Sequence, residues 1–494
     1  MSLPRRSVLA RLPIGRFIPA LRSPFARRWY SLNKGHDMTP AECYDVTIVG
    51  GGPAGCALAG VLSSMKAFEG MRIALVDPGR LCEAMQWKPP VDTYLSRTLQ
   101  ITARNQAFLE RHGLWSKCYT DRVQPCGRAV VTDALGRGVI DLAAADAPGP
   151  AQYGANVAYM VETRNFVGGL LRSIECSEGL VDMFERSKVI SIDDGAADNM
   201  PMLPVVNLSS KQRIRTRLVV GADGVNSCVR KHARIGTYGT EYSQFGLVAT
   251  LCLEELNHTA YQRFLPTGPI AMLPFPGGFA NLVWSLDLDL VQLLKTVPEH
   301  IFACLVNAAF RLPPHEIQHL YDLVQNGAAE SEVAAETKWR LEVFERNSAG
   351  RLNPELLPPK VAAISPRSRA SFPLRMRMVD SLVAERIALI GDAGHVMHPL
   401  AGQGLNMGLE DVQCLVGVLE QAILAGEDMG ACSVLSRYAK QRYMRNLAMQ
   451  GIVDKIWHVF GTSSSPVVAA RSLAMNALDM LPAAKRSLIK NIMA

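Results

Sequence analysis

Residues 44–77 read YDVTIVGGGPAGCALAGVLSSMKAFEGMRIALVD. The stretch begins with an apolar strand, turns through glycines into an alanine-rich helix, and ends with a second apolar strand. Gly50, Gly52 and Gly55 form the pattern G-x-G-x-x-G directly after the first strand, which is the arrangement of a βαβ unit that binds a dinucleotide. Because such a unit aligns two strands in parallel, the sequence predicts an α/β fold.

The three glycines have different physical roles in this unit. Gly50 allows the tight turn, Gly52 lets the backbone approach a pyrophosphate, and Gly55 lets the helix pack close to the strand. The unpaired N–H groups at the start of the helix attract the phosphates. Asp77 ends the second strand, where a carboxylate can accept a hydrogen bond from a ribose hydroxyl. The unit alone does not distinguish FAD from NAD.

A second stretch, far along the chain, makes that distinction. Residues 386–420 read RIALIGDAGHVMHPLAGQGLNMGLEDVQCLVGVLE, a strand, then Gly391-Asp392, a loop with proline and glycine, and an amphipathic helix. Asp392 is placed like a second hydroxyl-binding acid. The glycines around Asn406 leave backbone N–H groups open at the helix start, which suits the negative charge of a reduced flavin. A flavin needs this second set of contacts and a nicotinamide does not, so the two stretches together predict FAD.

A third motif lies between these two. Residues 218–230, LVVGADGVNSCVR, form an apolar strand that leads into Asp223-Gly224. The three motifs, in this order, resemble the aromatic-ring flavin monooxygenases of the para-hydroxybenzoate hydroxylase fold. Closer likeness is to the UbiH-type ubiquinone biosynthesis hydroxylases, and it runs from about Tyr44 to the C-terminus. The segments that carry it are QRFLPTGPIAMLP (262–274), GDAGHVMHPLAGQGLNMG (391–408) and GTSSSPVVAARSLAMNALD (461–479).

The resemblance implies a set of cofactor-binding residues. The glycine turn and Asp77 would hold the adenosine half of FAD, and Asp392 would hold the ribityl chain. Arg97, in SRTLQITARNQAFLERHGLW, is similar to the family's flavin-contacting arginine, and residues 399 and 404–406 would line the isoalloxazine largely through backbone atoms. The full set is Gly50, Gly52, Gly55, Asp77, Arg97, Asp223, Gly391, Asp392, Pro399, Gly404, Leu405 and Asn406.

The resemblance also implies an activity. The implied activity is that of an FAD-dependent monooxygenase, which would use O₂ to hydroxylate the 5-position of a polyprenylated 4-hydroxybenzoate-type ring in ubiquinone biosynthesis. A bound flavin activates oxygen, so the protein must supply position and a dry pocket, and no metal or nucleophile is required. With only one complete dinucleotide fingerprint, electrons come either from NAD(P)H that docks transiently or from a ferredoxin and its reductase. Likeness to mitochondrial members favours the ferredoxin.

The first thirty residues differ from the rest of the chain. They hold seven arginines and no acid, interleaved with apolar residues, which is typical of a mitochondrial presequence. A basic nucleic-acid-binding arm is the alternative. Their charge equals the net charge of the full chain, +7, so the remainder is near neutral and gives no indication of a nucleic-acid partner. Eleven cysteines without a CxxC pair indicate free thiols in a reducing compartment. We expect a location in the mitochondrial matrix.

These features divide the chain into parts. Residues 1–30 form the presequence; residues 44–118, 151–235 and 384–420 form a Rossmann-like FAD-binding domain; residues 119–150 and 240–383 form an interleaved β-sheet substrate domain; and residues 421–494 form a C-terminal helical region. RAVVTDALGRGVIDL (128–142) predicts a hairpin around LGRG. The C-terminal helices are expected to pack on the FAD domain, or to rest on the inner membrane or on other ubiquinone biosynthesis proteins.

Three rival functions remain. One is a flavin reductase or dehydrogenase that acts on a prenylated substrate without inserting oxygen, and another is a non-catalytic FAD-fold scaffold. A zinc peptidase is suggested by residues 315–319, HEIQH, which match the HExxH motif. Trp339 stands where the third ligand would be, so a solvated helix face is the favoured interpretation and no metal site is predicted. His395 and His398 are interpreted as residues that pack the flavin loop or lie next to the flavin, with a structural role favoured over a catalytic one.

Overall fold

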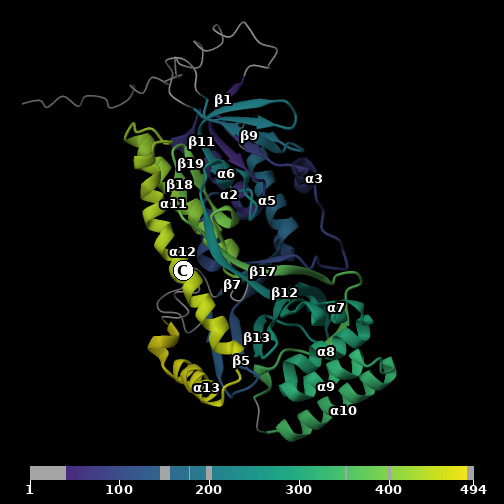
Figure 1. Ribbon diagram of the computed structural model, residues 1–494. Helices are drawn as coiled ribbons and strands as arrows, with labels where there is room; N and C mark the ends of the chain where they lie inside the picture. Colours follow the sequence, from purple (N-terminus) through teal and green to yellow (C-terminus); the bar gives the residue numbers. More distant parts are fainter. Residues whose placement is uncertain are drawn as a thin grey trace, which may run out of the picture.

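The computed structural model describes residues 41–144, 156–176, 179–195, 203–350, 353–398 and 402–486. The predicted presequence and the predicted site residue Pro399 lie outside this part of the chain. Figure 1 shows one sheet with its helices above a second sheet with its own helices. A long helix, α12 (Cys432–Gly461), runs beside both.

The upper layer is built on parallel strands. Neighbouring strands in it are β18 (Val383–Ala384), β19 (Ile387–Leu389), β11 (Arg213–Gly221), β1 (Glu42–Val49), β2 (Ile73–Val76) and β8 (Val181–Phe184). Each pairing from β19 to β8 is parallel, and β10 (Val205–Leu208) and β9 (Val189–Asp193) extend the sheet from β11 in antiparallel fashion. Val46, Thr47 and Ile48 face alternate sides of the sheet and are all fully buried. Both faces are therefore covered, as parallel strands require.

Helices pack closely on this sheet. α2 (Pro53–Ser64) connects β1 to β2, and it contacts both α5 (Thr163–Glu175) and α11 (Gly404–Leu424). Alanine and glycine supply half of its buried positions, so the neighbouring elements can approach its backbone there. The βαβ unit predicted from residues 44–77 is confirmed. Short connecting helices are α3 (Leu81–Met85), α4 (Ala103–Arg111) and α6 (Cys228–His232).

The lower layer is a nine-stranded sheet covered by helices. Its strands are β20 (His395–Val396), β17 (Ala370–Val379), β12 (Thr237–Leu253), β15 (Phe279–Asp287), β14 (Gly268–Phe275), β13 (Thr259–Leu265), β5 (Arg128–Asp133), β6 (Val139–Ala143) and β16 (Val361–Ile364). The helices are α7 (Leu288–Thr296), α8 (Glu299–Arg311), α9 (Pro314–Gln325) and α10 (Glu330–Ser348). The predicted hairpin is confirmed by the antiparallel pairing of β5 with β6. The long ribbon of β12 and β17 joins the two layers.

A small third sheet lies between the layers. It consists of β3 (Thr98–Thr102), β7 (Ala158–Glu162) and β4 (Gln124–Cys126). Two fully buried polar residues of the lower sheet tie the segment before β3 in place: the Thr250 hydroxyl donates to the Tyr94 carbonyl at 2.9 Å, and Asn281 donates to the Ser96 carbonyl at 2.9 Å. The α/β fold with an interleaved sheet layer and C-terminal helices is confirmed, whereas the exact domain boundaries stay predictions.

The last described helix, α13 (Ser465–Met480), seals an edge of the lower sheet with its polar side chains. Asn476 accepts the N–H of Val139 at 3.0 Å and Asp479 accepts the N–H of Asp141 at 2.9 Å, both from edge strand β6. Unpaired edge N–H groups are a template for aggregation, and α13 removes two of them. Within the described residues, no helix has the length and apolar character needed to cross a bilayer.

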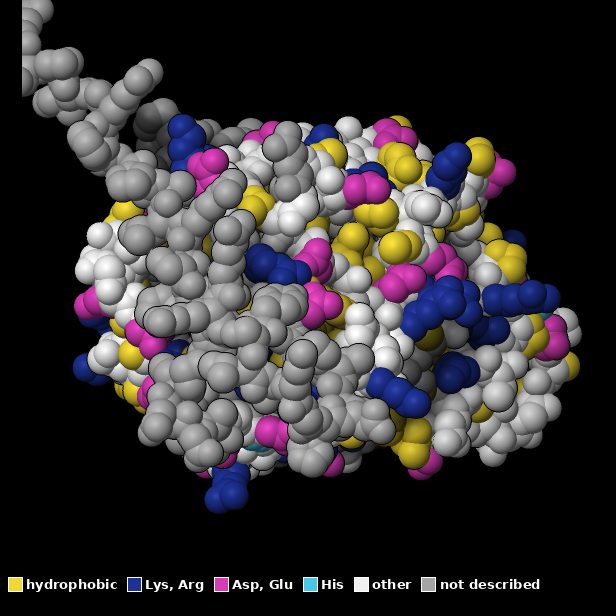
Figure 2. All heavy atoms as spheres, turned by 90° about the horizontal axis from the view of Figure 1, so that it is seen from above, with side chains coloured by type: hydrophobic (Ala, Val, Ile, Leu, Met, Phe, Trp, Pro, Cys, Tyr) yellow, Lys and Arg dark blue, Asp and Glu magenta, His cyan; other side chains and the backbone are white. Residues whose placement is uncertain are grey.

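The surface seen from the top of Figure 1 carries charges of both signs. Acidic and basic side chains are interspersed over the described residues there, with apolar side chains between them (Figure 2). This mixture agrees with the near-neutral charge of the chain after its first thirty residues.

One buried ion pair anchors α13. Arg471 donates to both carboxylate oxygens of Asp133, at 2.7 and 3.0 Å, and its remaining nitrogen donates to the Val459 and Thr462 carbonyls at 2.7 and 2.9 Å. Removing one partner of a buried pair leaves the other charge uncompensated, which costs about 3–5 kcal/mol. We therefore predict that Arg471→Ala releases α13, seen as faster hydrogen exchange in residues 465–480 and at the amides of Val139 and Asp141.

The matched control is Arg486→Ala, which removes an exposed arginine from the same end of the chain. It should leave exchange in α13 unchanged. Equal exchange rates in α13 for wild type and Arg471→Ala would contradict the anchoring role.

Candidate active site

The three sequence motifs meet at one edge of the parallel sheet. Gly50 follows β1, Asp77 follows β2, Asp223 lies just past β11 and Gly391 lies just past β19. These four strands are neighbours and run parallel, so their carboxyl ends form a single line. Open α/β sheets bind ligands at this edge.

The glycine turn is tightly built except at Gly52. Gly50 has φ +113°, and a Cβ on it would lie 2.3 Å from the Ala222 carbonyl oxygen. A Cβ on Gly55 would lie 1.9 Å from the Gly50 carbonyl oxygen. Nothing lies within 4 Å of a Cβ on Gly52. Two of the glycines are thus required by the protein's own packing, while space is left open beside the third.

Asp77 and Asp223 both hold backbone N–H groups. Asp77 accepts from Gly51 and Gly79 at 2.6 Å each, so it braces the glycine turn. One oxygen of Asp223 accepts from Cys228 at 2.6 Å and so supports the start of α6. The other oxygen of Asp223 is buried and has no hydrogen-bond partner among the described residues. A buried acceptor is costly to leave unmatched, so this oxygen suits a donor supplied by a bound group.

The Gly391-Asp392 turn sits against the glycine turn and near Arg97. Gly391 has φ +56°, and a Cβ on it would touch that of Ala54 at 3.4 Å. Solvent reaches Asp392, yet burial of its surroundings raises its pKa, and the charges of His395 and Arg97 oppose that rise. A carboxylate that is accessible but surrounded by protein lies in a cleft. Arg97, from a distant part of the chain, thus lies close enough for its charge to act on Asp392.

The start of α11 offers an open helix terminus. Among the described residues, no side chain caps α11 or α2, and neither helix has an acid in its first turn. Nothing lies within 4 Å of a Cβ on Gly404, and Leu405 packs partly buried on the core. Two free N-terminal helix ends and an open approach to the backbone suit an anionic, phosphate-bearing cofactor. The residues present therefore fit FAD.

The side chain of Asn406 points into the protein and is hydrogen-bonded there. It is fully buried, its oxygen accepts from the Thr102 N–H at 2.9 Å and from Asn105 at 3.0 Å, and its nitrogen donates to the Gln100 carbonyl at 2.9 Å. Any contact of Asn406 with a cofactor is thus left to its backbone. The side chain fixes the start of α11 against β3.

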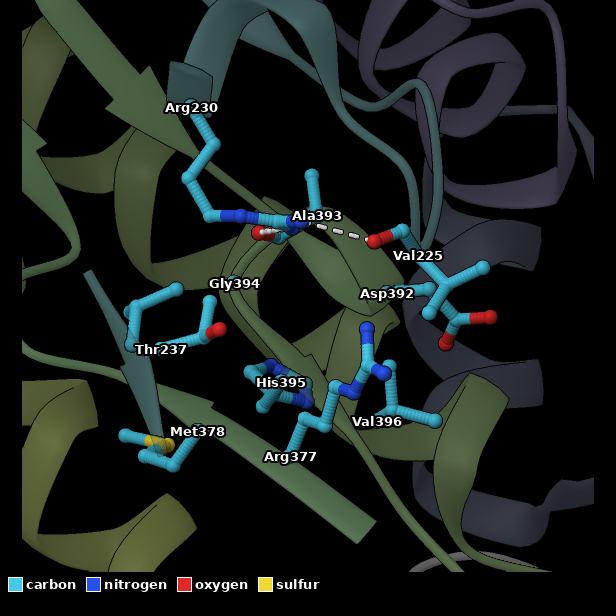
Figure 3. Close-up of a pocket in the computed structure, with 11 residues that line it drawn as sticks. Val225, Arg230, Thr237, Arg377, Met378, Asp392, Ala393, Gly394, His395 and Val396 are labelled. Carbon is cyan, nitrogen blue, oxygen red and sulfur yellow. Dashed lines mark hydrogen bonds between the residues drawn. The ribbon is translucent and has the colours of Figure 1, made fainter. Parts of the chain in front are cut away.

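A narrow pocket lies beside the Gly391-Asp392 turn. Figure 3 shows Arg230 and Arg377 extending into it, close to Asp392. Arg230 donates to the Ala393 carbonyl at 2.9 Å and to the Val225 carbonyl at 2.7 Å. Burial lowers the pKa of Arg230, and the charge of Arg377 lowers it further while Asp223 raises it. The pocket therefore contains two arginines and the acid Asp392, and Arg377 also forms an ion pair with Glu241.

Both loop histidines are buried, as expected of packing residues. His395 contacts Asp411 at 2.5 Å, and the His398 ring lies edge-on to Tyr242 with centroids 5.0 Å apart. Burial lowers the pKa of His398 to about 4, so it is neutral at physiological pH.

Sequence reasoning missed two buried ion pairs that position the site. Arg122 pairs with Glu162 at 2.8 Å, and together they hold the Pro90 and Thr93 carbonyls and the Leu95 N–H, in the segment that leads to Arg97. Arg442 pairs with Asp411 of α11 at 2.8 Å. Asp411 interrupts the apolar stripe of α11, and a buried acid implies a buried cation. The sequence therefore indicates that Asp411 has a buried cation as its partner, but it does not identify that cation as Arg442.

The HExxH segment lies on the surface of α9. His315 is 79% exposed and lies 3.9 Å from Glu316, and His319 lies 3.7 Å from Glu336 of α10. In the described part of the chain, no group of three or more histidine, cysteine or acidic residues is arranged to hold a metal ion.

Comparison with solved structures identifies the fold. p-Nitrophenol 4-monooxygenase PnpA from Pseudomonas putida DLL-E4 superimposes with a TM-score of 0.63 at 17% identity, covering 91% of this chain and 98% of PnpA. PqsL, described as a probable FAD-dependent monooxygenase from Pseudomonas aeruginosa, gives 0.59 at 18% identity, covering 87% of this chain and 99% of PqsL. At such low identity the likeness shows the fold alone.

Comparison with known sequences identifies the family. The model of the FAD binding domain family matches residues 43–289 and 324–451. The mitochondrial ubiquinone biosynthesis monooxygenase COQ6 of Saccharomyces cerevisiae is 34% identical over 457 residues, covering 91% of this chain and 93% of the relative. The Homo sapiens COQ6 is 31% identical over 454 residues, covering 90% and 92%. The chain therefore belongs to the COQ6 family of ubiquinone biosynthesis monooxygenases and is an FAD-dependent monooxygenase.

Proposed function

We propose that this monooxygenase hydroxylates the 5-position of a polyprenylated 4-hydroxybenzoate-type ring. One observation carries the proposal: the three cofactor motifs converge at the carboxyl ends of four neighbouring parallel strands. The names of the curated relatives support a ubiquinone precursor as the substrate. One atom of O₂ enters the ring, the other leaves as water, and a donor supplies two electrons.

FAD, when bound, supplies the activation of oxygen. The glycine turn and the start of α2 would hold its pyrophosphate. Asp77 and Asp392 would accept hydrogen bonds from its hydroxyl groups. The backbone at Gly404–Asn406 and the Arg97 guanidinium would hold the flavin end. At the end of β11, the carboxylate oxygen of Asp223 that has no hydrogen-bond partner among the described residues would accept a hydrogen bond from the cofactor.

The protein must also keep water away from the reacting ring. Phe264, Met397, Met407 and Val453 form a buried apolar cluster beside the flavin loop, with Trp457 and Phe460 packed on it. A dry apolar wall of this kind suits both the oxygen chemistry and a polyprenyl substrate.

We predict that the purified enzyme transfers one labelled atom from ¹⁸O₂ to the ring of the prenylated substrate, measured by mass spectrometry. A ferredoxin with its reductase should support this transfer better than NADPH alone, because the likeness to mitochondrial members favours that electron donor. Substrate oxidation without label in the ring would favour a dehydrogenase. A protein that binds no FAD would favour a scaffold.

Gly52 gives a test of the cofactor position. Because nothing in the protein occupies the space beside it and its φ is −75°, Gly52→Ala should leave the apoprotein's melting temperature near that of wild type. The added methyl would meet a bound pyrophosphate, so we predict FAD affinity about tenfold weaker in fluorescence titrations, which is about 1.4 kcal/mol.

The matched control is Gly417→Ala, at another glycine with open space beside it but in the body of α11. It should leave FAD affinity unchanged. Equal FAD affinities for Gly52→Ala and wild type would show that the pyrophosphate lies elsewhere.

We further propose that the enzyme works in the mitochondrial matrix, resting on the inner membrane through α12 and α13. Since the polar side chains of α13 face β5 and β6, its outer face is apolar. The exposed residues of that face are Pro466, Val467, Ala469, Ala470, Leu473, Ala474, Ala477 and Met480. Met444, Ile452 and Val459 are exposed on α12, next to the exposed Lys440, Arg445 and Lys455. Apolar side chains edged by cations suit an anionic bilayer surface.

Leu473, which is 72% exposed, tests this surface. Leu473→Glu should weaken sedimentation with vesicles of phosphatidylcholine and cardiolipin about tenfold, since burying a leucine contributes about 1.5–3 kcal/mol. Leu256→Glu, at a leucine 69% exposed in another part of the molecule, should bind as wild type does. Equal loss of binding in both variants would contradict the assignment. Wild-type binding by Leu473→Glu would contradict it too, and would leave the apolar face of α13 for another ubiquinone biosynthesis protein.

A further inference from the structure

One face of α12 carries buried polar side chains. Arg442, Asn446 and Gln450 follow one another at intervals of four residues, so they lie on the same face of the helix. All three are at most 4% exposed. Polar groups are costly to bury unless they are hydrogen-bonded, so their partners indicate what this face holds.

The partners belong to the described parts of the flavin loop (391–398 and 402–407), to α11 and, in the case of Arg377, to strand β17. Arg442 donates to Asp411 at 2.8 Å, to Glu410 at 2.6 Å and to the Met407 carbonyl at 3.2 Å. Gln450 donates to the Val396 carbonyl at 3.2 Å and to the Arg377 carbonyl at 2.9 Å.

Asp411 passes the contact on to the Gly391-Asp392 turn. Its carboxylate is fully buried and accepts four donors: Arg442, Asn446 at 3.3 Å, His395, and the N–H of Gly391 at 3.0 Å. Four hydrogen bonds use the full capacity of a carboxylate. Burial alone would raise the pKa of Asp411, but the charges and hydrogen bonds of His395 and Arg442 hold it below its ordinary value. The carboxylate is therefore ionised and fixed.

The described parts of the flavin loop are thus held by α12, either directly or through Asp411 of α11. Gly391 and His395 are held through Asp411, Val396 through Gln450, and Met407 directly through Arg442. None of these contacts uses Asp392 or the open backbone at Gly404, which stay available to a cofactor.

We propose that Arg442, Asn446 and Gln450 are positioning residues for FAD, which fix the backbone of residues 391–398 and 402–407 from the side of α12 without touching the cofactor. The inference rests on the proposed placement of FAD at this loop. A purely structural role would instead have the three residues only fasten α12 to the fold, with equal effect on the protein with and without FAD.

Two conservative variants with matched controls on the same helix separate these roles. Gln450→Leu keeps the size of the side chain and removes both of its hydrogen bonds, and its control is Gln441→Leu, at an exposed glutamine. Arg442→Lys keeps the charge and removes the planar fork of donors, and its control is Arg445→Lys, at an exposed arginine. Each purified protein is stripped of FAD, melted with and without FAD, and titrated with FAD by fluorescence.

We expect Gln450→Leu to weaken FAD binding a few-fold and Arg442→Lys about tenfold, with a smaller rise of melting temperature on adding FAD, whereas both controls match wild type. FAD affinities within twofold of wild type in both variants would overturn the proposal, even if the apoproteins melt earlier. If Arg442→Lys fails to fold, Gln450→Leu decides. Gly52→Ala, titrated alongside, separates the two claims: if it alone weakens binding, the positioning role is wrong but the cofactor site stands.

Discussion

The parallel alignment of β19, β11, β1 and β2 is the constraint on which the rest of the structure depends. Strands that run the same way end at the same edge, so motifs from residues 50, 77, 223 and 391 become neighbours. Close packing then fixes their spacing, because Gly50 lies against Ala222 and Gly391 lies against Ala54 and Gly408. The site is therefore a consequence of the sheet, and the loops only complete it.

The sheet alone does not fix the position of the loop between β19 and α11. Buried polar contacts fix its described parts. Arg442 and Gln450 of α12, with Asp411 of α11, hold the described parts of that loop, while Arg122 and Glu162 hold the segment before Arg97. The same helix α12 exposes Met444, Ile452 and Val459 among lysines and arginines, so the surface proposed to meet the membrane and the contacts to the flavin loop lie on two sides of one helix.

The sequence predicted the parts of the site that depend on local pattern. The glycine spacing, the succession of strand, helix and strand along the chain, and the acids at the strand ends could be predicted, because each depends on the local backbone conformation. Hydrogen-bond partners that lie far apart in the chain could not be predicted. Asn406 was expected to act through its backbone, and nothing in its neighbourhood predicts the side-chain bonds to Thr102 and Asn105, some 300 residues away. The inverted polarity of α13, with Arg471 inward and Leu473 outward, is likewise intelligible only once Asp133 and β6 are seen beneath it.

The most direct measurement of the central claim is the identity of the quinone precursor that accumulates in cells lacking this protein. Mass spectrometry of the lipid extract should show a prenylated ring that lacks one hydroxyl group, and the wild-type chain should restore the finished quinone. Unchanged quinone with no such precursor would contradict the assignment of this enzyme to ring hydroxylation.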